Sequence, residues 1–135
     1  MKQNILSTAK GEAAMSKAKV MVVDDSATEL KMMSEPFLSQ GYELITATDG
    51  DEAIQKAESE HPDLIVLDVV MPNLNGFNVC RHIKNSAELK DIKVILLTNK
   101  NQESDKFWGR KQGADAYMTK PFDKEKLLAT AAGLL

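Results

Sequence analysis

The sequence predicts an α/β fold in which an open, parallel five-stranded sheet is covered by helices on both faces. Five short apolar stretches alternate along the chain with five segments whose apolar residues recur at helical spacing. Two of the stretches, 64–67 (LIVL) and 93–98 (KVILLT), are almost uninterrupted apolar runs, which is typical of parallel strands buried on both faces. With 135 residues, 43% of them hydrophobic, the chain is long enough for one domain and one such fold.

The predicted elements follow from local patterns. The first strand, 19–23 (KVMVV), leads into Asp24 and Asp25, and a helix from residue 27 towards Gly41 comes next. Because Pro36 removes a backbone donor inside this helix, we expect a kink or an early end near Ser34. The remaining expected strands are 42–48, 64–67, 93–98 and 116–119, and the remaining expected helices are 51–60, 75–84, 103–112 and 123–135.

Composition excludes several functional classes. Residues 1–18 are expected to form a disordered tail without the apolar centre of a secretory signal, and Met15 is an alternative start. No apolar run approaches the roughly 20 residues of a membrane helix, so we expect a cytoplasmic protein with no membrane partner. The net charge of −3 and the pI near 5.4 argue against nucleic acid as a partner. The single cysteine, Cys80, excludes an internal disulfide and a multi-cysteine zinc site.

Polar residues stand at the carboxyl ends of four predicted strands. They are Asp24 and Asp25, then Asp68, then Thr98, and finally Lys120. Ligands of open α/β sheets bind beyond the carboxyl ends of the strands, so we expect these side chains to converge at one edge. Taken alone, the two adjacent aspartates could equally well be a helix N-cap pair, and a lone threonine is more often a strand-end residue that caps nearby backbone. Their common position is what favours a functional site.

The predicted cluster has the composition of a magnesium site that handles phosphate. Two carboxylates about 4 Å apart repel each other by roughly 4 kcal/mol at a partly wet site. Lys120 neutralises one charge, and Mg²⁺, which prefers a few carboxylates, water and phosphate oxygens, would neutralise the others. A carboxylate nucleophile at Asp68, with Lys120 and Thr98 to hold phosphoryl oxygens, suits phosphoryl transfer onto aspartate.

Four motifs carry a resemblance to a known family. VVDDS (22–26), LDVVMPNLNGF (67–77), LLT (96–98) and AYMTKPF (116–122) resemble the receiver domain of two-component response regulators, the CheY-like family, over residues 19–135. The resemblance implies the strand order 2-1-3-4-5 and a cis peptide before Pro121. It also implies that Asp68 accepts the phosphoryl group, that Thr98 and Lys120 hold it, and that Thr98 and Tyr117 switch. Mg²⁺ would be bound by Asp25, Asp68 and the Val70 carbonyl, with Asp24 assisting through water.

The segment 98–122 is similar, more narrowly, to stand-alone regulators of pilus-type chemosensory systems that control twitching or phototaxis. This implies a CheA-like histidine kinase as phosphodonor and a target protein that docks on helix 103–112, strand 116–119 and helix 123–135. We expect Phe107 to be the core residue of its helix and Trp108 to lie at the boundary, where packing and docking are both open. The candidate output surface contains Lys106, Trp108, Arg110, Lys111 and Tyr117.

Other functions remain open at this point. They are a phosphate sink, a docking module independent of phosphorylation, and an aspartyl-phosphate phosphatase; the last is disfavoured because Val70 stands where such enzymes carry a second acid. Asn99 is bulkier than the residue that the family often has after its threonine, and it could restrict access to the phosphoryl group. Neither Val70 nor Lys100 is suited to orient a hydrolytic water, so we predict slow autodephosphorylation. No enzymatic activity is expected beyond the protein's own phosphorylation and dephosphorylation.

Overall fold

The computed structural model describes residues 17–135 and contains one parallel sheet of order β2-β1-β3-β4-β5. This confirms the predicted fold and strand order; the tail expected at 1–18 lies, for residues 1–16, outside the described part. The strands are β1 (Lys19–Val23), β2 (Glu43–Ala47), β3 (Leu64–Leu67), β4 (Lys93–Thr98) and β5 (Ala116–Thr119). The helices are α1 (Ala27–Ser39), α2 (Gly50–Glu60), α3 (Gly76–Asn85), α4 (Glu103–Lys111) and α5 (Lys124–Leu134).

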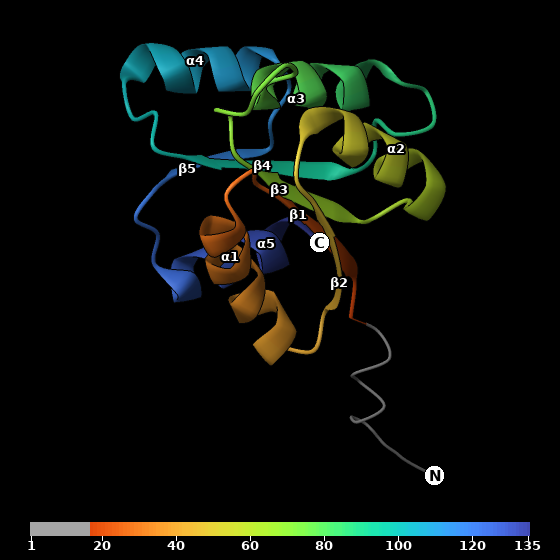
Figure 1. The fold of residues 1–135 in the computed structure, drawn as a ribbon, viewed down its shortest axis with the longest axis vertical. Coiled ribbons are helices and arrows are strands. Elements are labelled where there is room, and N and C mark those ends of the chain that lie inside the picture. Colours follow the sequence, from red (N-terminus) through yellow and green to blue (C-terminus); the bar gives the residue numbers. More distant parts are fainter. Residues whose placement is uncertain (1–16) are drawn as a thin grey trace, which may run out of the picture.

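The sheet separates two hydrophobic cores. Helices α1 and α5 cover one face, and α2, α3 and α4 cover the other (Figure 1). Because side chains alternate across a strand, Val20 and Val22 pack towards α1 and α5, whereas Met21 and Val23 pack towards α2 and α3. Both sets are fully buried, which explains why the central strands are continuous apolar runs.

Helix α1 does not end early at Pro36. It continues to Ser39, so the predicted early end near Ser34 is wrong. The Ser34 hydroxyl donates to the Leu30 carbonyl at 2.7 Å, and Pro36 and Phe37 are buried. Phe37 also meets the Tyr42 ring edge-on, with centroids 5.6 Å apart. Packing of the last turn therefore outweighs the one backbone hydrogen bond that proline removes.

The connections turn at residues with left-handed backbone or at buried apolar anchors. Gly41, with φ +83°, follows α1, and His61, with φ 47°, caps α2 before Pro62. Between α3 and β4, Leu89 and Ile92 are buried, and this anchoring was not predicted. No helix among residues 17–135 has the length and apolar character needed to cross a membrane.

Helix α4 packs differently from the prediction. Phe107 is 48% exposed and Trp108 is 53% exposed, so the assignment of Phe107 to the core is wrong. Within α4, all of which the structure describes, Gly109 is the buried residue. A Cβ at Gly109 would lie 2.7 Å from the Tyr117 ring. The helix therefore approaches the sheet through a residue without a side chain, and its two aromatic rings turn outwards.

Candidate functional site

The register of the sheet places the predicted site residues side by side. Val23 pairs with Leu67 in the last rung between β1 and β3, so Asp24 and Asp68 are the next residues on neighbouring strands. The Asp68 amide donates to the Val23 carbonyl at 3.2 Å. At the other side, the Lys120 amide donates to the Thr98 carbonyl at 2.8 Å. The converging edge predicted from the sequence is therefore present.

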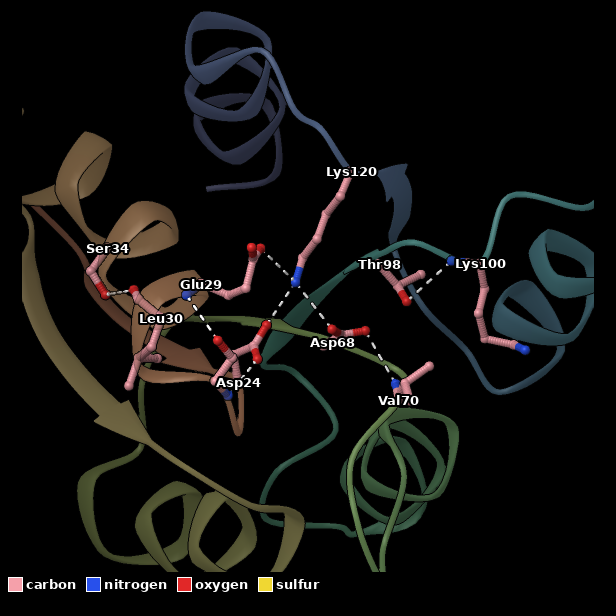
Figure 2. A network of polar contacts seen from close by, with 10 residues as sticks. Asp24, Glu29, Leu30, Ser34, Asp68, Val70, Thr98, Lys100 and Lys120 are labelled. Atoms are coloured by element: carbon pink, nitrogen blue, oxygen red, sulfur yellow. Dashed lines mark hydrogen bonds and ion pairs between the residues drawn. The ribbon is translucent and has the colours of Figure 1, made fainter.

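Lys120 is the centre of the cluster. Its ammonium nitrogen lies 2.7 Å from Asp24 Oδ2, 3.1 Å from Asp68 Oδ2 and 3.1 Å from Glu29 Oε1, and Figure 2 shows it pointing between the three carboxylates. The Lys120 and Asp24 side chains are only 6% and 2% exposed, and Asp68 is also buried. Charges this far from water are stable only when they are paired and hydrogen-bonded.

The second oxygens of the two buried aspartates are bonded to backbone amides. Asp24 Oδ1 accepts from the Ser26 amide at 2.9 Å, and Asp68 Oδ1 accepts from the Val70 amide at 3.1 Å. Each carboxylate is thus fixed on one side by its own loop and on the other by Lys120. The two side chains are preorganised by the backbone, which is what a reacting carboxylate needs.

Gly76 supports the Asp68 backbone from behind. Its amide donates to the Val69 carbonyl at 2.9 Å, and a Cβ at this position would overlap the Asp68 carbonyl oxygen and come within 2.8 Å of the Val69 Cα. Since the obstacle is backbone, no rotamer change could relieve the overlap. Helix α3 can approach the site this closely only because its first residue is glycine.

Burial and pairing act in opposite directions on the charged groups. Burial alone would lower the pKa of Lys120, but its hydrogen bonds to Asp24 and Asp68 and its contact with Glu29 raise that pKa above the ordinary lysine value. Burial raises the pKa of Asp24 despite the opposing effects of Lys120 and the Ser26 amide. Lys120 is therefore a cation throughout the physiological range, and it stabilises two buried acids at once.

Glu29 is the site residue that sequence analysis missed. Ser26-Ala27-Thr28-Glu29 has the S-x-x-E spacing of a capping box, and the Glu29 amide does donate to Ser26 Oγ at 3.3 Å. The reciprocal bond is not made, because the Ser26 amide donates to Asp24 instead. The Glu29 carboxylate is thereby left to pair with Lys120. The S-x-x-E pattern does single out Glu29, but it predicts a helix cap rather than a contact with Lys120.

The other predicted residues lie around this cluster with different exposure. Thr98 is fully buried at the end of β4, and its hydroxyl oxygen accepts weakly from the Lys100 amide at 3.4 Å. Asp25 is exposed, and Val70 is 59% exposed. Lys120 precedes a cis peptide to Pro121, as the resemblance implies.

The donor set suits a hard cation, although the described residues form no ready-made metal cage. Among residues 17–135, no three His, Cys, Asp or Glu side chains are already arranged around a common metal position. The available donors are carboxylate oxygens and a backbone carbonyl, which are ligands that Mg²⁺ accepts together with several waters. Three carboxylates surround one ammonium, so the cluster carries a net charge of 1 − 3 = −2. The residues present therefore fit a divalent cation.

Tyr117 connects the site to helix α4. Its hydroxyl donates to the Lys100 carbonyl at 2.8 Å, and its ring lies against Gly109 and joins the core beneath α2, α3 and α4. Burial, with smaller effects of Asp105 and Asp68, raises the pKa of Tyr117 to about 12. The phenol is therefore a neutral hydrogen-bond donor that ties β5 to the loop after Thr98.

Residues 20–132 match the family model described as the response regulator receiver domain. The chain belongs to the response regulator receiver family. It is 42% identical to Protein PilH of Pseudomonas aeruginosa over 118 residues, which are 87% of this chain and 98% of PilH. It is 45% identical to Protein PilG of the same organism over 111 residues, 82% of each chain.

The structure is similar to that of the chemotaxis protein CheY4 of Vibrio cholerae. The TM-score is 0.83 at 36% identity, and the match covers 89% of this chain and all of CheY4. Other relatives are named as transcriptional regulators, and the chain spans about half of their length. The family and the fold implied by the four sequence motifs are thus confirmed. The roles of individual residues are proposals that rest on the geometry above.

Proposed function

We propose that this protein is a phosphorylation-dependent binding switch in which Asp68 accepts a phosphoryl group from a histidine kinase. The observation that carries this proposal is the buried Lys120 ammonium held between Asp24 and Asp68. A lysine in this place can pair with the free Asp68 carboxylate before the reaction and with a phosphoryl oxygen after it. Membership of the receiver family supports the same reaction.

In the proposed reaction, an Asp68 carboxylate oxygen attacks phosphorus and forms a new P–O bond. The P–N bond to the kinase histidine breaks, and its electron pair returns to the imidazole. Lys120 and the Thr98 hydroxyl bind the phosphoryl oxygens. Because Asp68 is already oriented by the Val70 amide and Lys120, little reorganisation is needed.

Magnesium would be held by Asp24, Asp25, Asp68 and the Val70 carbonyl. The net charge of −2 around Lys120 and the oxygen-only donor set support this assignment. When bound, the ion neutralises charge on the phosphoryl group and on the oxygens that approach it. Asp25 follows Asp24 directly and is exposed, so its carboxylate is accessible to a hydrated ion.

The switch would run from Thr98 through Lys100 to Tyr117. A Thr98 hydroxyl that turns to a phosphoryl oxygen gives up its contact with the Lys100 amide. The Lys100 carbonyl holds the Tyr117 hydroxyl, so rearrangement of this loop changes how the ring sits under Gly109. A nearly complete shift between two states requires about 5.5 kcal/mol of preference, which several charge-assisted hydrogen bonds to a phosphoryl group can supply.

The output surface would lie on α4, β5 and α5. The members predicted from the sequence are Lys106, Trp108, Arg110, Lys111 and Tyr117, and we add Phe107 because its side chain is exposed. Phe107 and Trp108 meet edge-on with centroids 5.7 Å apart, and Lys111 lies over the Phe107 ring at 5.8 Å. Exposed aromatics flanked by basic residues are typical of binding hot spots. Similarity to PilH and PilG supports a target in pilus-linked motility and a CheA-like kinase.

The proposal is tested by incubating the protein with acetyl phosphate and Mg²⁺ and measuring its intact mass over time. We expect one phosphoryl adduct on the wild-type protein and none on Asp68→Asn, whose circular dichroism spectrum should match the wild type. Absence of an adduct on both proteins would favour a docking module that works without phosphorylation. Rapid release of phosphate over many turnovers would instead indicate a phosphatase.

We further propose that the phosphorylated state is long-lived. The Val70 side chain has no polar group to orient an attacking water, and the Lys100 ammonium lies 3.6 Å from Asp105 rather than at Asp68. The lifetime is measured by following loss of the adduct after removal of phosphodonor. Val70→Asn should shorten it; a wild-type adduct that decays faster than the Val70→Asn adduct contradicts the proposal.

A further inference from the structure

The three carboxylates around Lys120 are not equivalent. An ammonium group has three N–H donors. Two hydrogen bonds join it to Asp24 and Asp68, and Glu29 approaches the nitrogen to 3.1 Å as an ion pair. Asp24 and Asp68 are buried, and each has its second oxygen bonded to a backbone amide. Glu29 has a side chain that is 37% exposed, and among residues 17–135 its only ion-pair partner is Lys120.

Glu29 is also the carboxylate with room to leave. It lines a cavity of about 240 Å³ together with Met32, Asn99, Lys120, Pro121 and Phe122. A carboxylate that turns into this space regains water, whereas Asp24 and Asp68 have no comparable exposure. Glu29 also stays in the first turn of α1, where the helix dipole favours a negative charge. Breaking the contact between Glu29 and Lys120 is therefore the least costly way to free an N–H of Lys120.

We propose that Glu29 is a displaceable anion that occupies the Lys120 donor which the phosphoryl group later uses. In the unphosphorylated protein it completes the ion-pair set of Lys120 and keeps the ammonium in place. When a phosphoryl oxygen arrives at Asp68, it takes the third N–H, and Glu29 turns into the cavity and becomes hydrated. Glu29 is a positioning residue that competes with the phosphoryl group. This inference rests on the proposed role of Asp68.

Competition of this kind affects binding of the phosphodonor more than the chemical step. Removing the Glu29 charge frees an N–H of Lys120 and lowers the negative potential that an incoming phosphate meets. A partly exposed ion pair is weak, so we expect Glu29→Gln to lower the half-saturating acetyl phosphate concentration only about threefold to fivefold. The maximal rate should change less. The difference between the two proteins should shrink at high salt, because screening weakens exposed charges.

The experiment compares phosphorylation by acetyl phosphate in the wild type, Glu29→Gln and the matched control Glu35→Gln at low and high salt. Glu35 is an exposed glutamate on the same helix and lies away from Lys120, beside Pro36 and Leu38. Circular dichroism and thermal melting establish that each variant is folded. The half-saturating concentration and the maximal rate are fitted separately, so that a loss of structure is distinguished from a change in competition.

A lower half-saturating concentration in Glu29→Gln alone, reduced by salt, supports the proposal. An unchanged value, or a higher one, overturns it and leaves the role of Asp68 intact, because the adduct still forms. If neither the wild type nor Glu29→Gln forms an adduct, both the inference and the proposed function fail. If only Glu29→Gln reacts, Glu29 blocks Lys120 more strongly than expected, which again supports competition.

Discussion

The acid cluster at the carboxyl edge of the sheet and the surface of α4 and β5 are built on opposite principles. In the cluster, the carboxylates of Asp24 and Asp68 are buried and accept hydrogen bonds from backbone amides. At the surface, the Phe107 and Trp108 rings are about half exposed, contact each other edge-on, and have Lys111 over the Phe107 ring. Each region has one buried glycine at its closest approach, Gly76 against backbone and Gly109 against the Tyr117 ring. The first contact is rigid, and the second can adjust.

The largest effect is expected from Gly76→Ala. A methyl group here meets the Asp68 carbonyl and the Val69 Cα, and backbone cannot move aside without moving Asp68. We expect a loss of about 3 kcal/mol in the free energy of unfolding, at the upper end for overpacking, together with impaired phosphorylation. Urea denaturation measures the first quantity. A variant as stable as the wild type would show that the loop after β3 is not rigid.

A smaller effect is expected from Gly109→Ala. The new methyl group would lie 2.7 Å from one Tyr117 ring atom and 3.1 Å from Leu96 Cδ1, but both side chains can shift. The gain in helix propensity, up to about 1 kcal/mol, offsets part of the cost, so we expect a net loss of about 1 kcal/mol.

Gly133→Ala is the matched control for both glycine variants. It lies in α5, and a Cβ there meets nothing within 4 Å, so we expect unchanged or slightly higher stability. If Gly109→Ala were stabilised as much as this control, Tyr117 would not be confined beneath α4. Because one contact is rigid and the other adjustable, we predict that substitution by alanine destabilises the protein most at Gly76, less at Gly109 and least at Gly133.

These glycine contacts also show where sequence analysis succeeds and where it stops. The acid cluster was predictable because register follows from apolar runs, and the residues after Val23 and Leu67 must then be neighbours. The positions of Phe107 and Trp108 were not predictable, because α4 is short and its apolar pattern is weak. What orients that helix is a non-local contact between Gly109 and Tyr117, and helical spacing carries no information about it.

Glu29 and Pro36 illustrate the same limit inside one helix. The first turn of α1 has a capping-box pattern, yet Asp24 takes the Ser26 amide and releases Glu29 to Lys120. Pro36 disfavours a helix, yet Phe37 is buried in the last turn and the helix continues to Ser39. In both cases a tertiary contact decides between local options that the sequence leaves open.

The pH dependence of stability should include a contribution from outside both regions. Hydrogen bonds from Thr48 and Lys56 lower the pKa of Glu52 from its ordinary value of about 4.5 to about 2. A lowered folded pKa contributes stability above about pH 4.5 that is lost as the pH falls towards 2. Glu52→Gln should therefore flatten the stability curve in this window. At neutral pH it should cost no more than about 1 kcal/mol, because the side chain is 35% exposed.

Denaturation of the wild type and Glu52→Gln between pH 2 and 7 measures this contribution. Equal slopes of the two curves in the acid window would show that the Thr48 contacts do not persist in solution. Once the Glu52 contribution is subtracted, the remaining loss of stability in acid can be assigned to other carboxylates. This isolates the contribution of the acid cluster, which the α4 surface is not expected to share.

A small effect on stability is expected from Trp108→Ala. The ring is about half exposed and on a helix surface, so the free energy of unfolding should change by no more than about 1 kcal/mol. Binding of the phosphorylated protein to its target should in contrast fall strongly if Trp108 is a hot spot. Stability is measured by denaturation, and a loss of several kcal/mol would mean that α4 packs Trp108 inwards in solution.

The central claim is that a phosphoryl group at Asp68 is transmitted to the α4 surface through Thr98, Lys100 and Tyr117. It is tested most directly by recording amide NMR spectra of ¹⁵N-labelled protein with Mg²⁺, before and after addition of beryllium fluoride, an analogue of the phosphoryl group. The account predicts shifted amides at Asp68 and Lys120 and also at Lys100, Gly109 and Tyr117. Shifts confined to the acid cluster, with α4 and β5 unchanged, would contradict it.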